Sequence, residues 1–287
     1  ISQPERCFVA DGYTAYSQML SGNHENVGQL YTDQLDLDDN LARALGNSAL
    51  IINDTTLAHE AYRQAIRLED SRNDRKLNRL GLALIYADQG KWQHANDLFQ
   101  EAMSLNLEQH SLISQLWLDN ARKFTGNDGA LTLVDEWIAK NPTDGSAQIA
   151  RLREYTLQLI EVNTQLASIG EGEETQSTSL EEQKATLEKS QAAALSEAEK
   201  FFNQLDPWKS KNNTEILSQR IQYLAYKGDI TQAEKLLADT GERYNPDLQI
   251  ASATVHALNG NEEEAISALQ KSVLFAPENA GYSLFLK

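Results

Sequence analysis

The sequence predicts an all-α fold, a right-handed superhelical solenoid of antiparallel helix pairs, and three observations support this. First, an alanine returns every 32 to 37 residues, with one gap of 103 residues, and an aromatic or large aliphatic residue follows it four positions later. Second, a repeat period of about 20 to 50 residues is typical of solenoids. Third, 5 prolines and 15 glycines in 287 residues permit long helices. The recurring alanines are Ala58, Ala95, Ala130, Ala233 and Ala265.

The first half of the chain is predicted to hold four helical units within one solenoid that covers residues 1–287. Residues 1–39 form a degenerate N-terminal unit with weak periodicity, and residues 40–145 form three repeats. In the first of these repeats Gly46 marks one helix, and Ala58 and Tyr62 mark the next. Small and aromatic residues at this spacing indicate one face of a packed helix.

The clearest repeat lies at residues 75–108. Leucine and alanine recur along one helical face from Leu77 to Ala87. Gly90 then ends the helix, because glycine readily adopts the left-handed backbone that a tight helical turn needs. A second amphipathic helix follows, and two helices joined by so short a turn pack antiparallel. The next repeat is predicted to turn over four residues, the Gly-Asn-Asp-Gly sequence at 126–129.

The segment 146–207 is predicted to be a degenerate repeat whose two overlong helices form a hairpin, with an acidic mobile loop at residues 169–179. Ten consecutive residues of this loop carry no apolar side chain, so they cannot bury enough surface to offset the entropy of ordering. Ser179 followed by Glu182 forms a capping box, which predicts that the second helix begins at Ser179. Residues 208–287 are predicted to form two C-terminal repeats.

The residue pattern of these units resembles the tetratricopeptide repeat (TPR) family. In the clearest repeat the residues that carry the pattern are Leu82, Ala83, Tyr86, Ala95, Phe99 and Ala102. The resemblance covers two thirds of the chain. It implies a concave groove, lined by the first helix of each pair, that binds a protein or peptide partner.

The resemblance also projects partner-binding residues onto this chain. They are Asn40, Arg43, Asn47, Leu77, Leu80, Leu84, Gln115, Asp119, Arg122, Lys123, Gln219, Gln222 and Tyr226. Their mixed apolar and amide character suits an extended peptide or a partner helix. Arg43 and Asn47 also resemble one half of the carboxylate clamp of chaperone-binding members. Gly81 stands where that clamp places an asparagine.

No catalytic, cofactor-binding or metal-binding residue is predicted. The sequence holds neither a Walker-type phosphate loop nor a Gly-x-Ser-x-Gly nucleophile elbow. Its five histidines are scattered, and none belongs to a His-Glu-x-x-His pattern. The single cysteine, Cys7, excludes an internal disulfide framework and a site built on several cysteines.

The formal net charge of −17 limits the class of partner. Nucleic acid is bound by clustered lysine and arginine, and this acidic chain has no basic run, so we expect no nucleic-acid partner. No apolar run reaches the ~20 residues of a membrane span, so no membrane insertion is expected. The chain begins at Ile1 with no signal-like segment, which indicates a processed or trimmed product.

These observations predict a non-catalytic scaffold or adaptor that binds a protein or peptide in a bacterial multiprotein assembly. The amide-rich, acidic, nearly cysteine-free composition favours the periplasm or cell envelope, with the cytoplasm as the alternative. Three other functions stay open. The chain could be the docking domain of a larger enzyme or envelope machine, a small-molecule binder or enzyme that uses the groove, or a structural array that self-associates into a homo-oligomer through the hairpin.

Overall fold

The computed structural model describes residues 14, 17–18, 21–23, 39–69, 72–105, 110–169, 174–205, 213–241 and 245–274. The unit expected at residues 1–39 therefore lies almost entirely outside the described residues. In chain order the helices are α3 (Asp39–Ile51), α4 (Thr55–Leu68), α5 (Arg72–Asp88), α6 (Trp92–Ser104), α7 (His110–Lys140), α8 (Gly145–Ser168), α9 (Glu174–Gln204), α11 (Thr214–Tyr226), α12 (Ile230–Asp239), α13 (Pro246–Leu258) and α14 (Glu262–Leu274).

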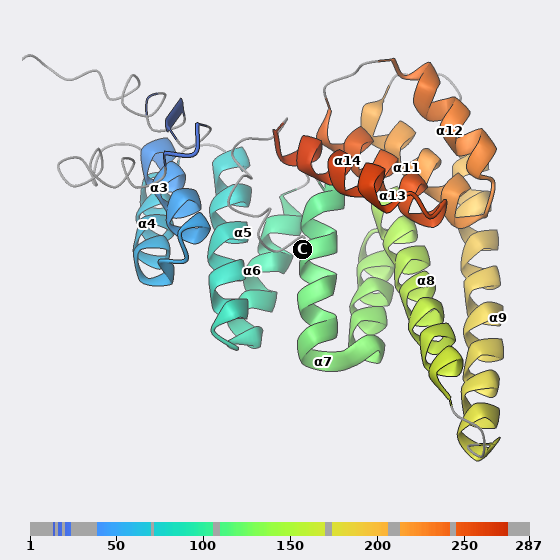
Figure 1. The fold of residues 1–287 in the computed structure, drawn as a ribbon. Coiled ribbons are helices and arrows are strands. Elements are labelled where there is room, and N and C mark those ends of the chain that lie inside the picture. Colours follow the sequence, from blue (N-terminus) through green and yellow to red (C-terminus); the bar gives the residue numbers. More distant parts are fainter. Residues whose placement is uncertain are drawn as a thin grey trace, which may run out of the picture. The chain divides into compact units, whose positions relative to one another are not determined.

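The all-α class and the arrangement in sequential antiparallel pairs are confirmed (Figure 1). Helix α3 packs on α4, α5 on α6, α8 on α9 and α11 on α12. Successive pairs are joined as well, because α4 contacts α5, α8 contacts α11 and α11 contacts α13. The right-handed turn of the complete array stays a prediction.

The chain forms two compact units, each with hydrophobic clusters of its own. Unit 1 comprises residues 1–120 and 269–287, and unit 2 comprises residues 121–268. One boundary falls within α7, a few residues before a break in that helix, and the other falls within α14. Gly126 has φ 75° and ψ −179°, whereas the residues on either side of it are helical. The expected four-residue turn at 126–129 is thus reduced to a break at one glycine, which tolerates this φ without strain.

The core of unit 1 is built around Tyr62 of α4, which is fully buried. Its ring packs with Ala58, Leu82 and Ile85, and its hydroxyl donates a hydrogen bond to Asn47 Oδ1 of α3. Helix α4 starts where Asp54 caps it, with the carboxylate accepting from the Leu57 backbone N–H at 3.0 Å.

Two glycines leave the space that the Tyr62 ring occupies. A Cβ on Gly46 of α3 would lie 2.8 Å from Tyr62 Cε2, and a Cβ on Gly81 of α5 would overlap Tyr62 Cε1 and Cζ. The Tyr62 ring of α4 therefore packs directly against the backbone of both α3 and α5. Only the absence of a side chain at these two positions allows the close approach.

The substitution Gly81→Ala is expected to lower the free energy of unfolding of unit 1 by about 1–3 kcal/mol, as overpacking of a tight core does. The buried Tyr62 ring cannot swing away, and its clash outweighs the gain in helix propensity, which is at most about 1 kcal/mol. Urea unfolding followed by circular dichroism measures the change. In a Tyr62→Leu background the same substitution should cost clearly less. An equal cost in both backgrounds would show that the ring is not the cause.

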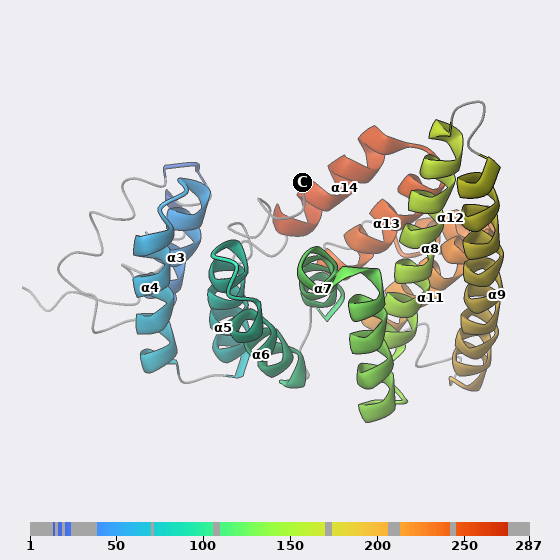
Figure 2. The same ribbon diagram turned by 90° about the horizontal axis from the view of Figure 1, so that it is seen from below.

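Unit 2 contains a pair of long helices, α8 with 24 residues and α9 with 31, which run side by side (Figures 1 and 2). One cluster joins the pair to α11 and includes Leu152, Phe202 and Tyr223. A second, smaller cluster farther along the pair is formed by α8 and α9 alone. Its buried residues are Val162, Leu180 and Leu187.

Helix α9 begins at Glu174, so the predicted start at Ser179 is wrong. Two physical effects favour the earlier start. Leu180 packs against Val162 of α8, which anchors the first turns of α9 by a contact that the local sequence does not reveal. The acidic Glu174 in the first turn also interacts favourably with the helix dipole. Residues 170–173 lie outside the described residues.

The rest of unit 2 is a compact group of shorter helices, α11, α12 and α13, around a cluster that includes Ile221, Leu248 and Val255. Asparagine caps two of these helices. Asn213 Oδ1 accepts from the backbone N–H groups of Glu215 and Ile216 at the start of α11, and Asn245 does the same for α13. Such caps satisfy donors that a helix start leaves unpaired.

Candidate functional site

The structure places the thirteen projected partner-binding residues in three different environments. Buried are Arg43, Asn47, Leu77, Leu80, Leu84, Gln219 and Gln222. Lys123 is exposed, and the partly exposed residues are Gln115, Asp119, Arg122 and Tyr226. The side chain of Asn40 lies outside the described residues.

Three of the projected residues are core residues, and their expected place on the groove surface is corrected. Leu77, Leu80 and Leu84 are at most 1% exposed, so they cannot contact a partner without unpacking α5. The opposite side of this helix is buried as well, at Leu82 and Ile85. A helix that is apolar on both sides is buried on both sides, and the periodicity of one face alone does not reveal this.

The surroundings of Arg43 and Asn47 do not suit a carboxylate clamp, which agrees with the break in the clamp pattern at Gly81. Both residues are at most 3% exposed. Arg43 Nη1 lies 3.9 Å from Asp39 Oδ2 one helical turn away, and Asn47 accepts the hydroxyl hydrogen bond of Tyr62. These polar groups therefore serve contacts inside unit 1 rather than a partner's carboxylate.

The projected glutamines of α11 connect neighbouring helices of unit 2. Gln219 Nε2 donates to Ser146 Oγ of α8 at 2.8 Å, where Gly145 leaves room for the amide. Gln222 Nε2 donates to Ser218 Oγ at 3.3 Å, and Ser218 Oγ in turn donates to the backbone carbonyl of Asp247 in α13 at 2.7 Å. Buried amides must find partners. The partner of Gln219 lies on α8, whereas Gln222 bonds within α11 to a serine whose hydroxyl reaches α13.

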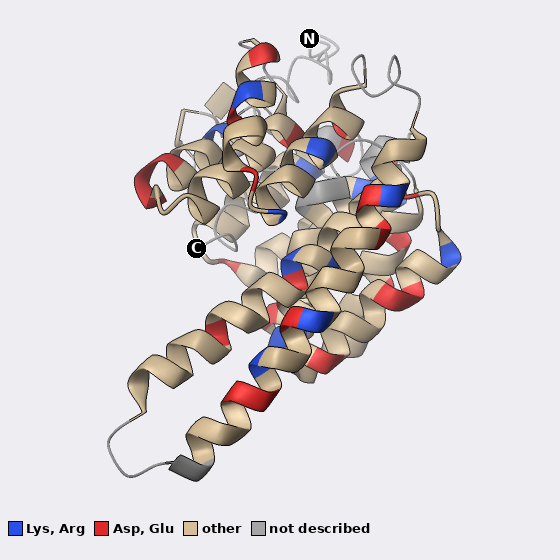
Figure 3. Cartoon of the chain, turned by 90° about the vertical axis from the view of Figure 1, so that its right-hand side faces the viewer, with Lys and Arg blue, Asp and Glu red and all other residues tan. Residues whose placement is uncertain are grey.

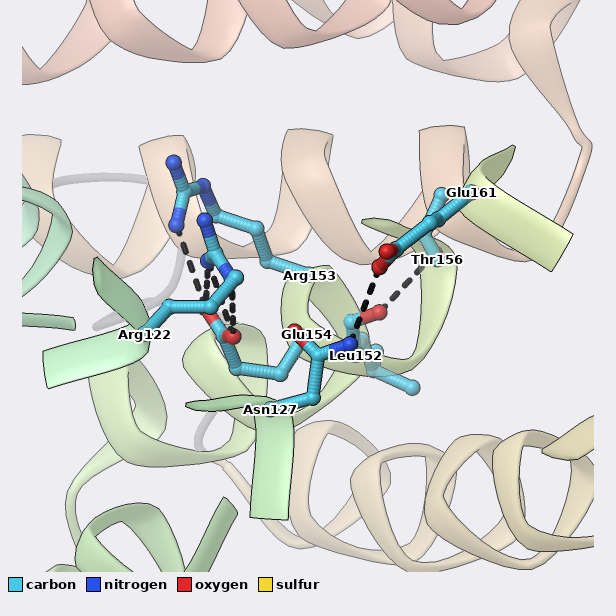
Figure 4. Close-up of polar contacts among 7 residues, drawn as sticks. All are labelled: Arg122, Asn127, Leu152, Arg153, Glu154, Thr156 and Glu161. Atoms are coloured by element: carbon cyan, nitrogen blue, oxygen red, sulfur yellow. Dashed lines mark hydrogen bonds and ion pairs between the residues drawn. The ribbon is translucent and has the colours of Figure 1, made fainter. Parts of the chain in front are cut away.

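The remaining projected residues include Arg122, which forms the best-defined polar cluster of unit 2 (Figure 4). Its Nη2 lies 2.8 Å from both carboxylate oxygens of Glu154, and its Nε lies 3.2 Å from Oε2. Arg153 Nη1 lies 3.2 Å from Glu154 Oε1. Two guanidinium groups thus meet one carboxylate, in a pairing of the strong, charge-assisted type.

The three members of this Arg122–Glu154–Arg153 cluster differ in exposure, and this decides what each can do. The Glu154 side chain is 0% exposed, whereas those of Arg122 and Arg153 are 25% and 19% exposed. The carboxylate therefore positions the two arginines, and only the arginines reach the surface. The cluster itself holds two guanidinium groups and one carboxylate, in a chain whose net charge is −17.

Sequence reasoning missed Glu154 and Arg153, although one signal could have found Glu154. Arg122 and Glu154 are 32 residues apart, which lies within the 32 to 37 residues that separate most of the recurring alanines. A second bond has nearly the same spacing, because Asn127 Nδ2 donates to Glu161 Oε2 at 2.9 Å across 34 residues (Figure 4). Two residues that lie one repeat apart and carry opposite charges, or a hydrogen-bond donor and an acceptor, are therefore candidates for a contact between neighbouring helix pairs.

Elsewhere on unit 2 basic groups lie beside acidic ones, as the colours along the two long helices show (Figure 3). Lys184 Nζ of α9 lies 4.0 Å from Glu188, and Arg151 of α8 bridges Asp135 at 2.9 Å and Glu197 at 2.5 Å. Within the described ranges, no three His, Cys, Asp or Glu side chains come together as a metal site. Among the same residues, no helix combines the length and the apolar character that crossing a bilayer requires.

Sequential antiparallel helix pairs, with small residues at their contacts and polar links between successive first helices, define a TPR-like helical-repeat fold. No protein-family model matches the chain, and no curated protein matches it. Among solved structures, the human IFIT1 dimer with m7Gppp-AAAA is similar at a TM-score of 0.39 and 14% identity, over 94% of this chain and 72% of that one.

Two bacterial TPR proteins are similar as well. The first is a thermophilic protein of Thermus thermophilus, with a TM-score of 0.32 and 19% identity over 74% of this chain and 98% of that one. The second is a protein of Parabacteroides merdae, with a TM-score of 0.32 and 17% identity over 96% of this chain and 100% of that one. The helix pairs themselves define the fold of this chain.

Proposed function

We propose that this chain is a non-catalytic scaffold that binds a protein or peptide segment through the surface of α7 and α8 at Arg122, Lys123 and Arg153. The observation that carries the proposal is the Arg122–Glu154–Arg153 cluster. Its buried carboxylate holds two partly exposed guanidinium groups in place, so a partner does not have to order them. Preorganised side chains of this kind reduce the entropic cost of binding.

The partner is expected to present a carboxylate to this surface. Arginine recognises carboxylates with strong, directional hydrogen bonds, and it is enriched among the residues that dominate binding energy. The net charge of −17 does not prevent such a contact at physiological salt, because charges farther away than about 8 Å are largely screened. Lys123, the next residue in α7, is exposed and adds a third cation.

The biological setting that we propose is a bacterial multiprotein assembly of the cell envelope. The support for it is compositional: an acidic, amide-rich chain with a single cysteine is suited to an oxidising compartment. Repeat scaffolds in such assemblies act by holding partners rather than by transforming them, which agrees with the expected lack of a catalytic constellation.

Charge reversal of one lysine tests the site. The protein with Lys123→Glu is expected to capture its main polypeptide partner from native cell extract about tenfold less efficiently than the unchanged protein, because like charges across an interface repel. Lys189→Glu, an exposed reversal on α9, is the matched control and should leave capture unchanged. Quantitative mass spectrometry with crosslinking measures both yields and locates the contact.

Two results would contradict the proposed function. If both variants capture equally well, the α7–α8 surface does not bind the partner. If all crosslinks join copies of the chain itself, the self-associating array becomes the better explanation.

A further inference from the structure

A histidine–tyrosine–histidine cluster lies where α4, α5 and α6 of unit 1 meet, outside the proposed binding surface. His59 Nε2 of α4 lies 3.3 Å from the hydroxyl of Tyr86 in α5, and the two rings meet edge to face with centroids 5.5 Å apart. The Tyr86 ring also contacts His94 of α6, again with centroids 5.5 Å apart. One tyrosine thus connects two titratable side chains from two helices.

The charged groups around His59 are positive. Arg63 lies one turn farther along α4, and Lys91 precedes α6 with its Nζ 5.6 Å from the centroid of the Tyr86 ring. Partial burial lowers the pKa of His59, and the charges of Arg63 and Lys91 lower it further. The neutral form of His59 is therefore the form that the folded unit accommodates best.

We propose that this cluster is a proton-sensitive joint: uptake of a proton by His59 weakens the packing of α4 against α5 and α6. The groups that face His59 are Arg63 on its own helix, Tyr86 on α5, and Lys91 at the start of α6, with His94 on the far side of Tyr86. A charge on partly buried His59 adds a third cation beside the exposed side chains of Arg63 and Lys91. It also forces Nε2 to act only as a donor toward Tyr86.

The direction of the pH dependence follows from linkage. An unfolded histidine has a pKa of about 6.5, and the folded pKa of His59 lies below that value. Between the two values the unfolded chain binds more protons than the folded one, so unit 1 loses stability as the pH falls. The stabilisation is complete above about pH 7 and is lost as the pH falls through the ordinary histidine range.

Nuclear magnetic resonance titration of the full chain, with His59 assigned through His59→Gln, tests this joint. We expect a His59 midpoint below about 6.5. Arg63→Gln should raise that midpoint because it removes a nearby cation. Arg67→Gln, one turn farther along the exposed side of α4, is the matched control and should leave it unchanged. A His59 midpoint at or above the ordinary value would overturn the inference.

A stability measurement separates a proton-sensitive joint from a histidine that titrates without consequence. The urea midpoint of unit 1 should fall more between pH 7.5 and pH 5.5 for the unchanged protein than for His59→Gln, whose amide keeps a hydrogen-bonding group but cannot take up a proton. Equal falls for both proteins would show that His59 protonation does not affect the packing.

Discussion

The substitution Tyr62→Ala is expected to lower the free energy of unfolding of unit 1 by about 3–5 kcal/mol, the range for removing a fully buried aromatic side chain. Tyr62 is 0% exposed and fills the space between Gly46 of α3 and Gly81 of α5. Because neither glycine has a side chain that could enter the cavity, the site cannot repack. The loss should therefore fall at the upper end of this range.

Urea unfolding monitored by circular dichroism, together with hydrogen exchange of α3, α4 and α5, measures this loss. Tyr62→Phe is the matched control, because it keeps the ring and removes only the hydroxyl that donates to Asn47. It should cost about 1–2 kcal/mol, the penalty of one buried acceptor left unpaired. A smaller loss for the alanine variant than for the phenylalanine variant would contradict this account of the core.

The substitution Arg122→Leu is expected to lower the free energy of unfolding of unit 2 by about 3 kcal/mol, because it leaves a buried charge with too few partners. The carboxylate of Glu154 is 0% exposed and cannot turn to water. Without Arg122 the carboxylate keeps its contact with Arg153 at 3.2 Å, but it loses the bidentate partner at 2.8 Å.

A double-mutant cycle distinguishes a buried-charge penalty from lost packing. Removing the carboxylate too, in Arg122→Leu with Glu154→Leu, should recover much of the stability, because no buried charge is left without its partner. Hydrogen exchange of α8 reports on unit 2 directly. If the double variant is no more stable than Arg122→Leu alone, packing of the arginine stem rather than charge explains the loss.

The helix pairs were predictable because their contacts repeat. The five recurring alanines are all buried, four of them at 0% exposure and Ala265 at 8%. Helix axes can approach closely only where side chains are small, so each repeat needs such a residue at the same place. Tyr62 and Phe99 at the following aromatic position are also fully buried. Local periodicity was enough to identify these residues.

The candidate site was much less predictable, for a different reason. Whether a first-helix residue faces a partner or a neighbouring helix depends on what packs beside it. Leu77 and Gln219 were projected onto one surface, yet Leu77 belongs to the core and Gln219 bonds to Ser146, 73 residues away in the sequence. The start of α9 was misplaced for the same reason, since Leu180 is anchored by Val162 of α8.

By itself the sequence determined the all-α class, the helix pairs and the positions of the small and aromatic residues between them, because a 3.6-residue periodicity and a repeat period are properties of the chain alone. Only the tertiary structure decided that Glu154 lies between Arg122 and Arg153, and that two glycines leave the space that the Tyr62 ring fills. Such contacts join different helices, and their energies depend on burial, which no single helix specifies.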